Sequence, residues 1–435
     1  MLPGQKAMER AAAFLVLVLV FTPCVRAQTS AQTSAQATAR PAGNDINSLR
    51  ERAAAGDAGA QFDLANYYFR GRFQTLEHAQ ALTWYLKSAG QGFAAAQNQL
   101  GVMYENGIAV PQNYKVAAAY YRKAADQGYA LAQFNLGVMY ESGKRGVSRN
   151  YKQALAWYRK AADQDLPQAE EEVGYFYQCG WGVGRDYAQA LAWYRRAAGH
   201  GNSNAESQLG YMAEAGWGQP QSYDEALSWY TKAAEHGNGQ AQENIGYMFQ
   251  HGTGVQTDYA QAMSWFYRAA ALGNRDAENQ LGWMYQYAQG VQQDNTRALD
   301  WYQLAADQGS IQGANNFQSL NDDLEDGSEV IGNSIKDPVA DAAIAQAQRR
   351  EQILDLRGRI DGLMADLELQ ESTIDQLEHP AKSGAVANMI GAVGSVIAVS
   401  FHAKAEKDRA EAASLRDQLA RLESQDQSAT GVPVR

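Results

Sequence analysis

The sequence predicts an all-α protein: a right-handed α/α solenoid of about seven 36-residue helix-pair repeats, followed by a C-terminal coiled-coil or helical-hairpin module. Three observations support this fold class. The pattern A-x-x-x-L-G-x-x-Y-x-x-G, followed by A-x-x-W-Y-x-K-A-A, recurs every 36 residues, with one step of 37. Both halves of the repeat carry apolar residues at helical spacing, and a heptad pattern follows the last repeat. The alanines that open the pattern are Ala60, Ala96, Ala132, Ala169, Ala205, Ala241 and Ala277.

Residues 1–27 are predicted to be a secretory signal peptide. Two basic residues precede an apolar run from Ala11 to Phe21, and Ala27 supplies the small residue that a signal peptidase requires. The apolar run is too short for an uncleaved anchor that spans a bilayer. Residues 28–44 are a low-complexity polar segment, which predicts a flexible linker.

The solenoid is predicted to span residues 45–320. The first helix of each repeat carries a Leu-Gly pair and a tyrosine on one face, as at Leu100, Gly101 and Tyr104. The second helix carries alanine and tyrosine on one face, as at Tyr121 and Ala124. Neither helix can bury its face alone, so the helices must stack, with glycines allowing close approach and larger side chains filling the gaps. Partial repeats at both ends are predicted to be caps.

The second-helix sequences at 154–162 and 190–198, Ala-Leu-Ala-Trp-Tyr-Arg-(Lys/Arg)-Ala-Ala, resemble the Sel-one-like repeat family (SLR), a relative of the tetratricopeptide repeats. The resemblance extends over about residues 60–312. Two turns depart from the family pattern: residues 70–73 lack the G-x-G-V turn, and Ala288 replaces a turn glycine. Some cysteine-rich relatives are associated with penicillin binding or β-lactamase activity, but they carry a cysteine pair in each repeat and this chain does not.

After the repeats, residues 321–339 are rich in Asp, Glu and Gly and predict an acidic linker. Residues 340–378 then predict a coiled coil, through which the chain would form a homo-oligomer. The alternative is an amphipathic helix that folds back on the solenoid. The apolar heptad positions are Ile353, Leu356, Ile360, Leu363, Leu367, Ile374 and Leu377, with Gln370 in the remaining core position.

Residues 384–401 are apolar and rich in glycine and predict a borderline transmembrane helix, which would attach the protein to a membrane. If this segment crosses a membrane, the basic residues after it place the tail in the cytoplasm. The alternative is the bend of a helical hairpin. Residues 402–435 form the C-terminal helix and tail, and in the hairpin this helix would pack through Leu415, Leu419 and Leu422.

Composition restricts the function. The formal net charge of −11 argues against nucleic acid as a partner. The chain has two cysteines, and Cys24 lies inside the predicted signal peptide. After cleavage Cys179 would be alone and no intramolecular disulfide could form. A lone thiol in a repeat protein is most often structural, so we do not predict a nucleophile there.

No pattern in the sequence predicts a catalytic residue, a metal site or a cofactor. His200 and His236 occupy the same turn of consecutive repeats, but their neighbours offer no further ligands. The run Glu170, Glu171 and Glu172 predicts a solvated helix face, because adjacent helical residues do not face one another. The sequence has no G-x-S-x-G, H-E-x-x-H or phosphate-binding glycine loop.

An aromatic column is the candidate binding site. It follows the Leu-Gly pair in four consecutive first helices, and if these helices line a concave groove, the rings form a ladder along it. Acidic residues lie one helical turn away, and an aromatic, acidic groove is suited to an extended peptide with basic or prolyl residues. The alternative is that the rings pack between adjacent first helices. The candidate residues are Tyr175, Tyr211, Tyr247 and Trp283, with Glu171, Glu243 and Glu214.

Together these features predict an exported, non-catalytic protein-protein interaction scaffold of the periplasm or cell envelope, whose partner is an unknown protein or peptide. Solenoids offer long surfaces rather than enclosed pockets, which favours recognition over catalysis. One alternative is an envelope hydrolase of the β-lactamase-like type, based on family association alone. A second alternative is a membrane-anchored periplasmic display arm attached through residues 384–401.

Overall fold

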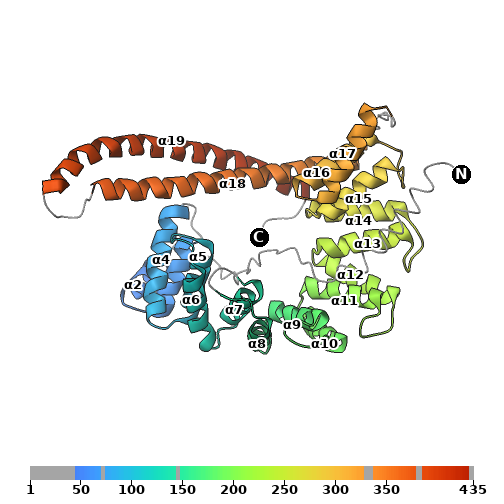
Figure 1. Cartoon of the computed structure of the whole chain (residues 1–435), viewed down its shortest axis with the longest axis horizontal. Helices are drawn as coiled ribbons and strands as arrows, with labels where there is room; N and C mark the ends of the chain where they lie inside the picture. Colours follow the sequence, from blue (N-terminus) through green and yellow to red (C-terminus); the bar gives the residue numbers. More distant parts are fainter. Residues whose placement is uncertain (1–44, 70–73, 144–146, 328–336, 379–384, 431–435) are drawn as a thin grey trace. The chain divides into compact units, whose positions relative to one another are not determined.

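The computed structural model describes residues 45–69, 74–143, 147–327, 337–378 and 385–430. Consecutive helices pair along the repeats, and the described residues contain no strand (Figure 1). The predicted all-α array of helix pairs is confirmed. The chain divides into two compact units, Met1–Pro220 and Gln221–Arg435. The predicted signal peptide at 1–27 and linker at 28–44 lie outside the described residues.

The first unit begins with α2, which covers the first complete repeat. Leu49 and Ala53 of α2 pack in one cluster with Ala60 and Leu64 of α3, so α2 acts as a cap for the apolar face of α3. The helices of this unit are α2 (Asp45–Ala54), α3 (Ala58–Phe69), α4 (Gln74–Gly90), α5 (Ala94–Asn106), α6 (Tyr114–Asp126), α7 (Ala130–Ser142), α8 (Tyr151–Ala162), α9 (Pro167–Cys179), α10 (Tyr187–Gly199) and α11 (Ser203–Ala215).

The second unit continues the helix pairs and ends in two long helices. Within the predicted linker at 321–339, α17 continues to Glu325 and the next helix begins at Pro338. The helices of this unit are α12 (Tyr223–Glu235), α13 (Gly239–His251), α14 (Tyr259–Ala271), α15 (Arg275–Gln286), α16 (Asn295–Asp307), α17 (Ile311–Glu325), α18 (Pro338–Glu378) and α19 (Ala385–Thr430).

Side-chain caps and left-handed turn residues determine where the helices begin and end. The second helices α6, α8, α10, α12, α14 and α16 each follow an Asn, Asp or Ser, whose side-chain oxygen accepts a hydrogen bond from a backbone N–H of the first turn. Asn113, for example, accepts from the Val116 N–H at 3.1 Å. The first helices α5, α7, α9, α11 and α13 end at a glycine with positive φ, such as Gly107 (φ 71°). Ala288, which replaces a turn glycine, adopts φ 54° and therefore carries backbone strain.

The glycine of the Leu-Gly pair makes room for an aromatic ring. A Cβ atom at Gly137 would lie 2.6 Å from the ring of Tyr158, which is closer than any unbonded carbon contact. Tyr158 is fully buried, and its hydroxyl donates a hydrogen bond to Glu141 on the same first helix at 2.6 Å. The glycine therefore seats the ring of the second helix against the backbone of the first. Any larger residue would force the pair of helices apart.

The N-terminal turns of α18 pack on the last repeats of the second unit. The Tyr285 hydroxyl donates to Asp337 at 2.8 Å, directly before α18, and Arg297 donates to Asp341 at 2.8 Å. The alternative prediction, a helix that folds back on the solenoid, therefore describes this part of α18. The residues of α18 that join the core cluster of α14, α15 and α16 are Ala340, Ile344 and Ala347.

Beyond those turns, α18 and α19 form an antiparallel helical hairpin (Figure 1). Arg357 contacts Glu423 at 2.7 Å and Gln370 contacts Asp408 at 2.7 Å, so later residues of α18 meet earlier residues of α19. This is the predicted hairpin, in which the heptad face of α18 packs against α19 of the same chain. Homo-oligomerisation through 340–378 stays a prediction. The apolar contact is made by Leu356, Ile360 and Leu415, with Leu363, Leu419 and Leu422 packed against them.

The predicted transmembrane segment at 384–401 coincides with the first part of α19. The side chains of residues 385–401 lie outside the described residues, so the predicted membrane attachment stays a prediction. Within the part of the chain that the structure describes, no helix has the length and apolar character needed to cross a membrane.

Candidate functional site

Two of the ladder residues, Tyr175 and Tyr211, lie in the first unit and are held in the same way. Tyr175 on α9 stands edge-on to Trp181, with ring centroids 5.3 Å apart and an interplanar angle of 86°. Tyr211 on α11 stands edge-on to Trp217, at 5.2 Å and 90°. Burial raises the pKa of Tyr211, and the half-buried carboxylate of Glu214 raises it further. Both ladder tyrosines are half-buried and held by the turn of their own repeat.

Each of these turn tryptophans also stacks on a tyrosine of the preceding repeat. Trp181 stacks on Tyr151, the first residue of α8, with centroids 4.8 Å apart and an angle of 22°. Trp217 stacks on Tyr187, the first residue of α10, at 5.0 Å and 21°. The contacts create two equivalent sets of three rings, all of them half-buried, which we call ring platforms. Platform one is Tyr151, Trp181 and Tyr175, and platform two is Tyr187, Trp217 and Tyr211.

The second glycine of the Gly-Trp-Gly turn brings each tryptophan onto its partner. A Cβ atom at Gly182 would lie 2.6 Å from the backbone of Tyr151, and one at Gly218 would lie 2.9 Å from the backbone of Tyr187. Only glycine allows this approach, so the turn lies directly against the second helix of the preceding repeat. The turn tryptophans are functional candidates that the sequence analysis missed. Their signal is a bulky residue between two turn glycines in two consecutive repeats.

The other two ladder residues, Tyr247 and Trp283, lie in the second unit and have different neighbours. Tyr247 on α13 stacks on His251 at 6.0 Å, and its hydroxyl accepts a hydrogen bond from Gln280 of α15 at 2.8 Å. Trp283 packs against the exposed ring of Tyr287 at 4.9 Å. Both ladder rings are half-buried. Because the Tyr247 contact joins two first helices, the alternative of packing between adjacent first helices applies at that residue.

Two acidic members of the predicted groove are buried. Glu171 and Glu243 are only 7% and 4% exposed. Each accepts a hydrogen bond from the asparagine that caps the next first helix, Asn202 at 3.3 Å and Asn274 at 2.7 Å. Burial raises the pKa of Glu243 to about 7, although the hydrogen bond from Asn274 acts in the opposite direction. These two carboxyl groups therefore join adjacent first helices instead of facing a peptide in a groove.

The predicted solvated face at Glu170, Glu171 and Glu172 is a wrong prediction, because all three residues are buried, Glu170 completely. Glu170 Oε1 forms an ion pair with Arg196 Nε at 2.6 Å, and its Oε2 lies 2.9 Å from His200 Nδ1. The partners of Glu170 come from a segment about 30 residues later in the chain. Local helix geometry could not show them, and without them a buried carboxylate is not expected.

Glu170 occupies a position that joins neighbouring repeats throughout the first unit. In an earlier repeat this residue is Gln97, whose amide donates to the Ala89 carbonyl at 3.3 Å and accepts from Gln127 at 2.7 Å. Glutamate has no N–H to donate, and Arg196 Nη2 instead donates to the equivalent carbonyl, of Ala162, at 2.8 Å. We call these contacts junction bridges. Their members are Gln61 with Gln91, Gln97 with Gln127, Gln133 with Gln164, and Glu170 with His200.

The Glu170 bridge also gathers three groups of the kind that bind metals. One ligand atom each from Asp165, Glu170 and His200 lie within 4.8 Å of one another. This cluster was not predicted from the sequence, because Asp165 and Glu170 lie far from His200 along the chain. Arg196, however, forms ion pairs with both carboxylates, at 2.7 Å to Asp165 and 2.6 Å to Glu170. A guanidinium group already neutralises the anionic donors, so these residues fit an ion network better than a cation site.

Cys179 is the half-buried last residue of α9. The predicted lone thiol depends on removal of residues 1–27 together with Cys24, and it stays a prediction. The second cysteine lies outside the described residues.

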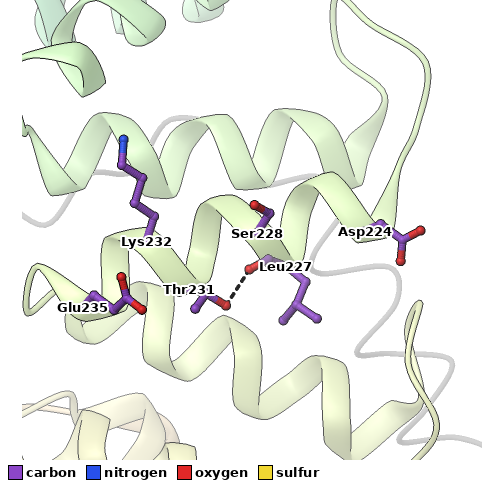
Figure 2. A pocket seen from close by; sticks show the side chains of 6 residues that line it. All are labelled: Asp224, Leu227, Ser228, Thr231, Lys232 and Glu235. Carbon is purple, nitrogen blue, oxygen red and sulfur yellow. Dashed lines mark hydrogen bonds between the residues drawn. The ribbon is translucent and has the colours of Figure 1, made fainter.

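A shallow hollow lies along one face of α12 in the second unit (Figure 2). The charged side chains that border it are spread along the helix rather than directed at one point, and the Thr231 hydroxyl is used in a hydrogen bond to the Leu227 carbonyl at 2.7 Å. None of the candidate residues lies in it, and one helix face does not enclose a ligand. The lining residues are Asp224, Leu227, Ser228, Thr231, Lys232 and Glu235.

Comparison with protein families finds seven consecutive matches to the Sel1 repeat, at residues 58–93, 94–129, 130–166, 167–202, 203–238, 239–274 and 275–310. Among solved structures, the chain is similar to a Sel1 repeat protein from Oxalobacter formigenes, with 34% identity, a TM-score of 0.53, and coverage of 57% of this chain and 96% of that one. It is also similar to a protective antigen of uropathogenic Escherichia coli that displays an SLR fold, with 26% identity, a TM-score of 0.55, and coverage of 90% and 98%. No curated protein matches the chain.

Proposed function

We propose, because this chain belongs to the Sel1 repeat family, that its repeats form a non-catalytic scaffold that binds a protein or peptide partner. Sel1 repeat proteins are generally protein-protein interaction scaffolds. The finer proposal is that a partner binds along the face formed by the first helices of each unit. In the first unit these helices carry Tyr175 and Tyr211. In the second unit they carry Tyr247 and Trp283.

The observation that carries the proposal is a half-buried aromatic ring at the same position of four consecutive first helices. The fold does not require a ring there, because the same position holds Asn66, Val102 and Val138 in the earlier repeats. A large ring that is partly covered by protein and partly open to solvent has little freedom to lose on binding. Such rings are frequent anchors of protein interfaces.

We also propose that the protein acts in the periplasm or cell envelope after export. The support is the sequence of residues 1–27, with basic residues, an apolar run and a small residue at the expected cleavage position. Edman sequencing of the protein isolated from an envelope fraction tests this proposal. An N-terminus at or near Gln28 is expected, and a chain that still begins at Met1 would contradict export by cleavage.

The binding proposal is tested by capture of partners from an envelope extract on the immobilised full chain, followed by calorimetry with the captured partner. Tyr211→Ala and Tyr247→Ala are each expected to weaken binding about tenfold, the effect of losing one anchor. Tyr104→Ala is the matched control, because Tyr104 is a half-buried tyrosine that stacks on Tyr120 in a different column. Unchanged affinity in both ladder variants, with lowered melting temperatures, would assign the rings to packing alone.

A further inference from the structure

The repeats at 167–202 and 203–238 differ from the others at one turn position. Directly after the residue that ends the first helix, these two repeats have Trp181 and Trp217. Other repeats have Ile108, Thr253 and Gln289 at this place. The fold therefore accepts an aliphatic or a polar residue here. The repeat fold alone therefore does not explain why two consecutive repeats have a tryptophan at this position.

The same two repeats are the first to carry a ladder tyrosine, so each has gained two rings that touch one another. Together with the tyrosine of the preceding second helix, these rings form platforms one and two, whose centroid distances agree within a few tenths of an ångström. Rings held by two partners keep their orientation when the surface is free. Preorganisation of this kind lowers the entropy cost of binding.

Each platform has an exposed cation over one of its tyrosine rings. The exposed guanidinium of Arg149 lies 5.8 Å from the ring of Tyr151, and that of Arg185 lies 5.9 Å from the ring of Tyr187. Glu171, the acidic residue that the sequence analysis placed in the groove, is buried and hydrogen-bonded to Asn202. At platform two, half-buried Glu214 lies beside Tyr211, and exposed Asp186 caps α10 directly before Tyr187. Each platform nevertheless has an exposed arginine over one of its tyrosine rings, and this guanidinium repels a basic ligand.

We infer that the two ring platforms bind an extended acidic peptide, which places one apolar side chain on each platform and its carboxylates beside Arg149 and Arg185. This inference rests on the proposed scaffold function and names the partner of its first unit. Two equal platforms in consecutive repeats favour a ligand with two anchors, because a second anchor on the same chain binds at high effective concentration. The acidic character replaces the basic character that the sequence alone predicts.

The test is selection of displayed random dodecapeptides on the immobilised full-length chain. Peptides that combine Asp or Glu with aromatic or prolyl residues are expected to be enriched. The variant with both Trp181→Ile and Trp217→Ile should bind the selected peptides about a hundredfold more weakly, from about tenfold for each anchor lost. Because Ile108 already occupies this turn position in another repeat, the variant is expected to fold. Trp84→Phe, in a repeat without a platform, is the control and should bind as the wild type does.

A second variant tests the charge. Arg149→Gln with Arg185→Gln should reduce the enrichment of acidic residues and the salt dependence of binding, while leaving the preference for apolar anchors. Enrichment of Lys or Arg, equal binding by the Trp181→Ile, Trp217→Ile variant, or no enrichment at all would overturn the inference. Capture of an envelope partner that does not depend on Trp181 and Trp217 would overturn the inference and leave the scaffold function standing.

Discussion

In the first unit, two junction bridges occupy equivalent positions in their repeats, but one is made of neutral amides and the other of charged groups. Gln97 and Gln127 meet as two neutral amides, and Gln97 also binds the carbonyl at the end of the preceding second helix. At the equivalent position Glu170 meets His200, and Arg196 supplies the donor to the carbonyl. In the first bridge, the amide groups of two side chains make all of these hydrogen bonds. In the second bridge, the carboxylate of Glu170 is completely buried and needs a cation to compensate its charge.

The comparison shows which hydrogen bonds a junction bridge must make and which side chains can make them. Every bridge must supply a donor to the carbonyl eight residues before the bridging side chain, and a partner from the turn that follows the second helix of the same repeat. An amide pair meets both needs without charge. An ionic bridge meets them too, but its members depend on one another, so removal of one leaves another buried without compensation. We therefore expect neutral and ionic bridges to respond very differently to equivalent substitutions.

Arg196→Ala is expected to have the largest effect. It removes the ion pair to Glu170 and the hydrogen bond to the Ala162 carbonyl, and it leaves a buried carboxylate without its cation. The expected loss in free energy of unfolding is about 4 kcal/mol, measured by urea denaturation of the first unit within the full chain. Combining it with Glu170→Gln should recover much of the loss, because the bridge then resembles the neutral one at Gln97. A double variant no more stable than Arg196→Ala would contradict this explanation.

Glu278→Gln is expected to stabilise the second unit in a pH-dependent way. Glu278 is completely buried and accepts two hydrogen bonds from Gln308 at 2.6 Å, and burial raises its pKa to about 7. Its folded-state pKa lies above its ordinary value of 4.5. The folded state therefore favours the protonated form of Glu278. Its contribution to the free energy of unfolding is complete below about pH 4.5 and is lost as the pH rises to about 7.

Glutamine at 278 carries no such penalty, so the variant should exceed the wild type by at most about 3 kcal/mol at about pH 8, and by much less at about pH 5. Denaturation curves at both pH values measure the difference. Glu235→Gln, at an exposed residue of α12, is the control and should show no such pH dependence. An equal difference at both pH values would show that Glu278 is not the titrating group.

Gln127→Ala tests the neutral bridge. It removes the donor to Gln97 Oε1, and the expected cost is about 1 kcal/mol, the usual contribution of one neutral hydrogen bond. Thermal and urea unfolding of the variant can be compared directly with Arg196→Ala. If the two substitutions cost the same, the distinction between neutral and ionic bridges has no energetic meaning.

Asp165→Gly should have the smallest effect. Asp165 adopts φ 58° at a position where the neighbouring repeats have glycine, as at Gly128 and Gly201. Glycine relieves the backbone strain but loses the exposed ion pair to Arg196, and the two effects oppose one another. The melting temperature should change by less than about 2 °C. A large decrease would show that Asp165 is an essential member of the ionic bridge.

The sequence predicted the seven repeats and their period, because the Leu-Gly and Trp-Tyr pairs are local signals that recur in most repeats. The heptad positions of α18 also identified the apolar face that packs on Leu415 and its neighbours. The burial of Glu170 could not be predicted, because its compensation comes from Arg196 and His200 on another helix. The aligned repeats nonetheless contain a signal. Gln133 pairs with Gln164 in one repeat, and in the next repeat the equivalent positions hold Glu170 and His200.

The candidate site was predicted in part. The ladder position of Tyr175 and Tyr211 is visible once the repeats are aligned. Their contacts with Trp181 and Trp217 were not predicted, because a residue inside a glycine-rich turn has no periodic signal of its own. The acidic character of the groove was inferred in part from Glu171, although the sequence does not show that this side chain is buried. Charge in a sequence indicates exposure only on average, and a capping asparagine 31 residues later can satisfy a buried carboxylate.

The junction bridges connect residues that lie close together in the sequence, which affects when the chain can fold during its synthesis. The bridges from Gln61 to Gln91 and from Gln97 to Gln127 each connect residues only 30 positions apart. Both residues of a bridge belong to one repeat, so a ribosome has to release only that helix pair, and not the whole array, before the bridge can form. Because no contact of this kind waits for distant sequence, we expect the first unit to consolidate from its N-terminal end while later repeats are still being translated.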